Sequence, residues 1–208
     1  MKLKLTIASA FLALAVSSNA ANYLITNVAT GDGSADALFQ NYNGTLSTGI
    51  VALGYFPAGY VFTTGVAAAT NFTTLGSALA GSYSATLDAS KAGYVEATVS
   101  GSSITAGNAL LGRDLYVFAG NASTIALSNQ YAVAKVGTIA DDVPFVQDYV
   151  ANPFGATPVI GTIGSYTGDA SGLGSSTYTT LQLAGVPETS TALLGAIGAL
   201  GLLRRRRN

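Results

Sequence analysis

The chain has 208 residues, contains neither Cys nor His, and carries a charge on only 9% of its residues, for a net charge of −1. The absence of Cys and His excludes thiol catalysis, Ser-His-Asp triads and metal sites built on His ligands. Between two terminal segments of targeting composition, residues 21–185 hold three cations and nine anions, a net charge of −6, which excludes nucleic-acid binding through a basic patch.

Residues 1–20 have the pattern of a secretory signal peptide. A basic start precedes an apolar run over residues 5–16, and small residues precede the junction of Ala20 with Ala21. The apolar run is short for a permanent membrane span, and a buried N-terminal helix is the alternative. We expect a signal helix that is cleaved between Ala20 and Ala21, so that the protein is exported.

Strand patterns predominate in residues 21–185, which we expect to be an exported β-rich domain. Residues 94–99 alternate between apolar and polar side chains, as in a half-buried strand. Residues 49–56 are apolar on both faces, which is typical of a central strand covered on both sides. Further strands are expected at residues 23–28, 37–42, 115–119, 130–136, 158–163 and 178–183.

Gly, Asn, Asp and Ser fill the gaps between these strands, as turns require. The pattern predicts an all-β, mostly antiparallel fold, a β-sandwich or barrel-like single domain with at most one short helix. That helix is expected within the Ala-rich residues 66–80. Residues 141–180 contain three prolines and many Gly, Ser and Thr, and we expect a long surface connection there before the last strand.

Carboxylates are the main side chains left for catalysis or metal binding. The neighbours Asp141 and Asp142 point in opposite directions in an extended chain, so an acidic turn is favoured over one half of a glycosidase pair. Asp32, Ser34 and Asp36 alternate as in a calcium loop but lack the later Gly and Glu, and so indicate a solvated turn. We expect no catalytic residue, no metal ligand and no cofactor.

Tyrosines leave a second interpretation open. The chain has 11 Tyr and no Trp, and an exposed Tyr ring stacks on sugars, although Tyr also suits half-exposed strands. The candidates are Tyr55, Tyr60, Tyr94 and Tyr116. The alternative function is therefore a carbohydrate-binding module, or a carbohydrate-active one if two carboxylates converge on one cleft.

The chain ends in a tail of sorting type at residues 186–208. The motif "VPETS" is followed by 13 uncharged residues at 191–203 and then by four arginines. A helix of that length spans about 20 Å, against a hydrocarbon core of about 30 Å. We expect a short transmembrane helix, stopped by the positive cluster on the cytoplasmic side. The motif residues are Val186, Pro187, Glu188, Thr189 and Ser190, and the stop residues are Arg204, Arg205, Arg206 and Arg207.

This tail resembles the PEP-CTERM sorting signals of Gram-negative bacteria, in which a Val-Pro-Glu-Pro-type motif, a short transmembrane run and an arginine-rich end are read by an exosortase. Val186, Pro187 and Glu188 match the motif, whereas Thr189 replaces its second Pro. That departure keeps a sortase signal open, and a permanent tail anchor is a third option. The resemblance implies an exported, non-enzymatic protein of the cell surface or extracellular matrix. Its expected partners are signal peptidase, an exosortase-type enzyme, the membrane in transit and exopolysaccharide.

Overall fold

Strands make up most of the chain that the computed structural model describes, namely residues 21–27, 38–63, 66–79, 81–87, 92–101, 104, 107–139, 149–151, 158–170 and 174–185. The strands are β1 (Ala21–Thr26), β2 (Leu38–Gln40), β3 (Ile50–Tyr55), β4 (Thr73–Thr74), β5 (Gly81–Ser82), β6 (Ser84–Thr86), β7 (Glu96–Gly101), β8 (Asp114–Gly120), β9 (Gln130–Thr138), β10 (Tyr149–Ala151), β11 (Pro158–Ile160), β12 (Thr162–Ala170), β13 (Gly174–Gln182) and β14 (Ala184–Gly185). The helices are α1 (Val66–Asn71) and α2 (Leu75–Ala78), and neither has the length or apolar character needed to cross a bilayer.

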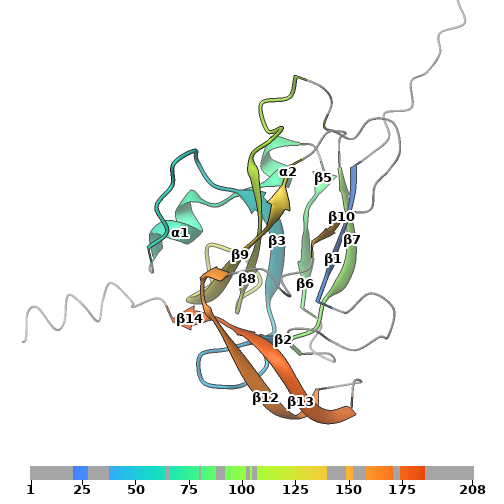
Figure 1. Cartoon of the computed structure of the whole chain (residues 1–208), viewed down its shortest axis with the longest axis vertical. Helices are drawn as coiled ribbons and strands as arrows, with labels where there is room; N and C mark the ends of the chain where they lie inside the picture. Colours follow the sequence, from blue (N-terminus) through green and yellow to red (C-terminus); the bar gives the residue numbers. More distant parts are fainter. Residues whose placement is uncertain are drawn as a thin grey trace, which may run out of the picture.

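A seven-stranded sheet forms the centre of the fold. Its strand order is β11-β9-β8-β3-β4, with β14 added beside β9 and β6 beside β3 (Figure 1). All of its pairs are antiparallel, and Val51 of β3 lies opposite Ala119 of β8. An irregularity between Leu115 and Tyr116 shifts the register of β8 against β9. The expected all-β, mostly antiparallel class is therefore confirmed.

Both faces of this sheet are buried, because its strands are apolar at odd and even positions alike. In β8, Leu115 and Val117 enter one hydrophobic cluster, whereas Tyr116 and Phe118 enter a second cluster on the opposite face. In β3, Val51 and Leu53 face the first cluster and Ala52 the second. The prediction of a central strand at residues 49–56, covered on both sides, is confirmed.

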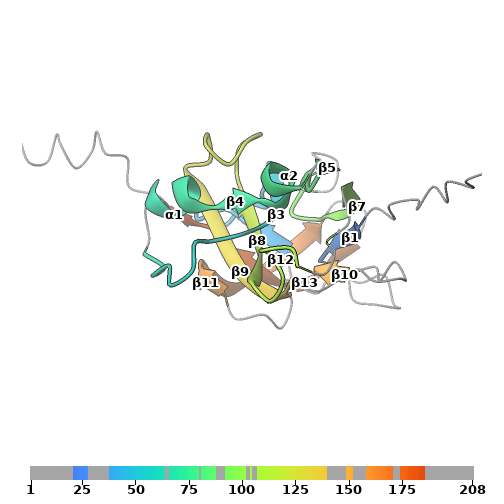
Figure 2. The same cartoon turned by 90° about the horizontal axis from the view of Figure 1, so that it is seen from above.

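The first cluster joins the central sheet to the other strands. It includes Ile25 of β1, Phe39 of β2 and Leu181 of β13. The second cluster is closed by α1, through Ala68, and by the segment after β3, through Phe56. In both views, α1 lies on one side of β3 and β8, and β1 and β7 lie on the other (Figures 1 and 2).

A four-stranded sheet with the order β10-β1-β7-β5 contains the predicted strands at residues 23–28 and 94–99. β1 pairs antiparallel with β7 and parallel with β10. The alternation predicted at residues 94–99 holds where burial is described, since Val95 is buried and Glu96 is exposed.

The strand predicted at residues 178–183 is confirmed by the end of β13, but the expected surface connection before it is corrected, because most of residues 162–177 belong to a long antiparallel hairpin of β12 and β13. It pairs Tyr166 with Tyr178 and Thr167 with Thr177, and β2 joins β13 in parallel at the lower end of the molecule in Figure 1. The Gly and Ser content suggested a loop, but Thr and Tyr are strong strand formers when they meet across a ladder. Residues 141–148 and 152–157 lie outside the described residues.

The limit of one helix was wrong, because residues 66–79 contain two helices with β4 between them. Thr73 and Thr74 are β-branched, and they pair with Tyr55 and Gly54 of β3 instead of continuing the helix. The expected signal helix at residues 1–20 and the expected transmembrane helix in residues 186–208 lie outside the described residues.

Candidate functional site

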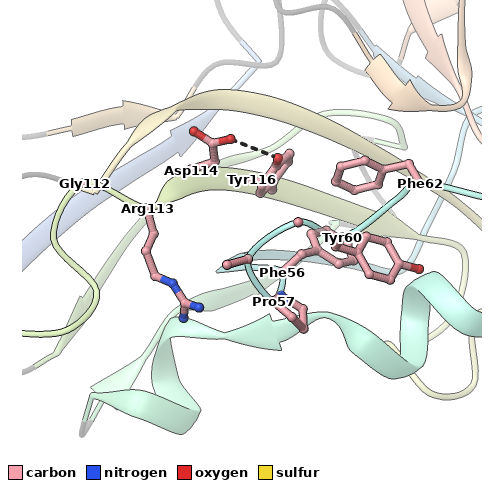
Figure 3. Close-up of a pocket in the computed structure, with 10 residues that line it drawn as sticks. Phe56, Pro57, Tyr60, Phe62, Gly112, Arg113, Asp114 and Tyr116 are labelled. Carbon is pink, nitrogen blue, oxygen red and sulfur yellow. Dashed lines mark hydrogen bonds between the residues drawn. The ribbon is translucent and has the colours of Figure 1, made fainter.

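A pocket of about 450 Å³ lies between the segment that follows β3 and the turn that precedes β8. The segment after β3 lines the pocket with Phe56, Pro57, Tyr60 and Phe62, and the turn before β8 lines it with Arg113 (Figure 3). The volume falls within the range of small-molecule sites, which are mostly apolar with a few polar groups.

The aromatic wall of the pocket is built around Phe56. Its ring stacks on Tyr60, with centroids 4.8 Å apart, and meets Phe62 edge-on at the same distance. Phe56 also meets Tyr116 of β8 edge-on at 5.3 Å. Such pairs each contribute roughly 0.5–1.5 kcal/mol beyond the burial of their area. The segment after β3 is therefore held by ring contacts, although it is not a strand.

The turn that precedes β8 fixes the position of Arg113. Gly112 adopts a φ of +75°, which favours glycine, and the Arg113 N–H donates to the Leu110 carbonyl at 3.1 Å. The guanidinium carbon lies 4.8 Å from the centre of the Tyr55 ring. Within the described part of the chain, no carboxylate forms an ion pair with Arg113.

By contrast, the negative charge of Asp114, the next residue, is balanced by an ion pair. Lys135 Nζ lies 2.7 Å from its Oδ1, and the Tyr116 hydroxyl donates a hydrogen bond of 3.3 Å to its Oδ2. The register of the sheet explains this, because Lys135 on β9 stands opposite Tyr116 on β8. Burial, aided by the negative charge of Asp114 and by this hydrogen bond, raises the pKa of Tyr116 above its usual value.

One described carboxylate, that of Asp114, lines this pocket. Hydrolysis of a glycoside by the usual route needs two carboxyl groups across one bond. The described acids Glu96, Asp114 and Asp169 belong to three different sheets, so the described residues bring one carboxylate to the pocket. No group of acidic residues able to hold a metal ion occurs among the described residues.

Three of the four candidate tyrosines gather at this pocket. Tyr60 and Tyr116 line it. The ring of Tyr55 contacts the guanidinium of Arg113, which lines it as well. Tyr94 lies elsewhere, against the cluster of Leu38, and donates a hydrogen bond to Glu96.

Sequence patterns did not predict five residues at or next to the pocket: Phe56, Phe62, Arg113, Asp114 and Lys135. One signal was present in the charge count, because Arg113 and Lys135 are two of the three cations in residues 21–185.

Most other candidates lie outside the described residues. Ala21 is an exception, since it is the first residue of β1 and pairs with Gly101. Gly185 of β14, the residue before the tail motif, pairs with Gln130. The candidates outside are Ala20, Asp32, Ser34, Asp36, Asp141, Asp142, Val186, Pro187, Glu188, Thr189, Ser190, Arg204, Arg205, Arg206 and Arg207. Comparisons of the chain with protein-family models, with curated proteins and with solved structures found no match.

Proposed function

We propose that this chain is an exported, non-enzymatic protein of the cell surface or extracellular matrix, sorted through its C-terminal tail. The observation that carries the proposal is the order of features in residues 186–208: a Val-Pro-Glu motif, a short uncharged run and four terminal arginines. The signal-like residues 1–20 at the other end support the same route.

In this proposal the tail residues have distinct roles. Pro187 and Glu188 present an extended segment to an exosortase-type enzyme. Residues 191–203 hold that segment at the bilayer, and the four arginines keep the chain end on the cytoplasmic side.

The described part of the chain runs from Ala21 in β1 to Gly185 in β14, and the residues before and after it lie outside the described residues. We include in the proposal that residues 21–185 form one sandwich- or barrel-like domain, because its largest hydrophobic cluster contains residues of all three sheets.

The test is the intact mass and the terminal peptides of the protein recovered from the surface and medium of its native host. A product that starts at Ala21 and ends near Pro187 and Glu188 is expected. A C-terminal end between Thr189 and Ser190 would favour cleavage by a sortase. A product that keeps the arginine cluster would contradict cleavage by either enzyme and would indicate a permanent membrane anchor. Replacement of the four arginines by Gln should disturb sorting and leave signal cleavage unchanged.

Carbohydrate binding is a second candidate function, and the pocket of Phe56, Tyr60, Phe62 and Arg113 favours it. Aromatic rings offer a surface for the apolar face of a sugar, and a few polar groups at the rim can recognise its hydroxyls. The test is binding of oligosaccharides to the full chain, designed below.

A further inference from the structure

We propose that the pocket beside Arg113 takes a carboxylate-bearing sugar unit, such as a uronic acid of an extracellular polysaccharide, and that Arg113 contacts its carboxylate. This inference rests on the carbohydrate binding proposed above and adds the charge class of the ligand. It is argued from the pocket alone and does not depend on the tail.

The distribution of charge favours an anionic ligand at this pocket. Residues 21–185 carry a net charge of −6, yet both cations that the structure describes, Arg113 and Lys135, lie at this pocket or one contact from it. Among the described residues, Lys135 balances Asp114, and no carboxylate pairs with Arg113. The described groups at this pocket therefore carry a net positive charge, which attracts an anion.

The hydrogen-bond donors of Arg113 suit a carboxylate. A guanidinium has five N–H donors in its plane, and stacking on a ring uses only its flat face. The guanidinium carbon of Arg113 lies over the Tyr55 ring, and this cation–π contact needs none of the N–H donors. A planar group held in this way matches the two oxygens of a carboxylate, which it binds through two parallel hydrogen bonds.

Aromatic side chains line the pocket on the side away from Arg113 and offer a surface for a sugar ring. In the view of Figure 3, Arg113 reaches out on one side of Phe56 and Pro57, and Tyr60 and Phe62 stand on the other. Tyr60 and Phe62 are only partly buried, and both pack on Phe56. A ring that rests on this wall can direct a carboxylate toward Arg113.

Asp114 adds a polar group at the rim. Its side chain is 43% exposed, and a carboxylate has lone pairs beyond those used by Lys135 and Tyr116. These can accept hydrogen bonds from sugar hydroxyls. Because Lys135 balances its charge, Asp114 does not cancel the attraction of Arg113 for an anion.

The experiment measures binding of the full chain, purified in mild detergent, by calorimetry. The probes are trimers of galacturonate and of mannuronate and a glucuronate-containing tetrasaccharide, each compared with its methyl ester. Esterification removes the charge and keeps the ring. We expect at least one acid form to bind about tenfold more tightly than its ester, as loss of a charge-assisted bidentate contact requires.

Variants identify the residue responsible. Arg113→Gln should lower the affinity for the acid form to the affinity for the ester. Arg113→Lys keeps the charge but not the planar fork, and its affinity for the acid form should lie between those of the wild type and Arg113→Gln. Asp169→Asn, on the β12 hairpin, is the matched control and should bind as the wild type does. Thermal unfolding of each variant checks that the fold is kept.

The outcomes separate the two proposals. Equal affinity for acid and ester would overturn the acidic-unit inference and leave saccharide binding in place. Binding of neither form across the whole panel would overturn both. Full affinity for the acid form in Arg113→Gln would remove Arg113 from the site. None of these results bears on the sorting of the tail, which is measured on the termini.

Discussion

The hydroxyl of Thr180 donates a hydrogen bond of 2.9 Å to Oε1 of Gln40, a residue 140 positions earlier in the chain. Both side chains are buried. The amide nitrogen of Gln40 donates in turn to the carbonyl of Gly44 at 2.7 Å, and its backbone carbonyl accepts from the N–H of Leu183 at 2.7 Å. The bonds of Gln40 with Thr180 and Leu183 connect β2 to the end of the β12–β13 hairpin. A buried polar contact therefore joins the last strands to the first part of the fold.

Thr180→Val tests this link. Valine keeps the shape of threonine but leaves Oε1 of Gln40 buried without a donor, and we expect a loss of about 1–3 kcal/mol in the free energy of unfolding. Denaturant titration measures the loss. Thr180→Ser keeps the hydroxyl and should lose less. A valine variant as stable as the wild type would mean that the bond contributes nothing.

The hairpin also shows which parts of the fold sequence patterns predict. Strand β3 was predictable because residues 49–56 carry no charged side chain and are apolar on both faces, which is typical of a strand buried on both sides. Strand β12 and the first part of β13 were not, because their Gly, Ser and Thr match those of a loop, and they become strands through pairing with each other. The end of β13, which pairs with β2, falls within the predicted strand at residues 178–183.

The pocket could be predicted only in part. The tyrosines Tyr55, Tyr60 and Tyr116 were candidates from composition, and they do gather there. Arg113 and Phe62 lie far apart in the sequence and share no motif, so only the pairing of β3 with β8 brings their segments together. Sequence patterns report periodicity within a segment, whereas this site depends on contacts between segments.

Gly54→Ala should destabilise the protein strongly. A Cβ at Gly54 on β3 would collide with the carbonyl oxygen of Thr73 and with the ring of Phe72. Overpacking of this kind costs about 1–3 kcal/mol. The control is Gly185→Ala, because a Cβ there meets no atom within 4 Å. Thermal unfolding should show a lower midpoint for the first variant only, and equal midpoints would contradict the packing of β4 on β3.

Tyr60→Phe should stabilise the protein. The hydroxyl of Tyr60 is buried and has no hydrogen-bond partner among the described residues, so folding removes it from water without compensation. Its removal should raise the free energy of unfolding by about 1 kcal/mol. Tyr178→Phe is the matched control, because that hydroxyl donates to the Gly174 carbonyl at 2.7 Å and its loss should destabilise. A destabilised Tyr60→Phe would show that this hydroxyl has a partner.

Stability should fall between about pH 10 and 12 through Tyr94. Its hydroxyl donates a hydrogen bond of 2.6 Å to Glu96, and burial, this bond and the charge of Glu96 raise the pKa of Tyr94 from 10.0 to about 12. Between these values the folded chain holds a proton that the unfolded chain has released. The contribution of Tyr94 is therefore complete below pH 10.0 and is lost as the pH rises through about 12.

The measurement is the free energy of unfolding in urea across that pH range. Glu96→Gln removes the negative charge that helps to raise the pKa of Tyr94, so the fall should be shallower in this variant. Tyr94→Phe removes the titrating group and should also flatten the curve, which leaves the slope due to Tyr116, whose pKa is raised by burial and by Asp114. If both variants kept the wild-type slope, the pair of Tyr94 and Glu96 would have no part in the alkaline loss of stability.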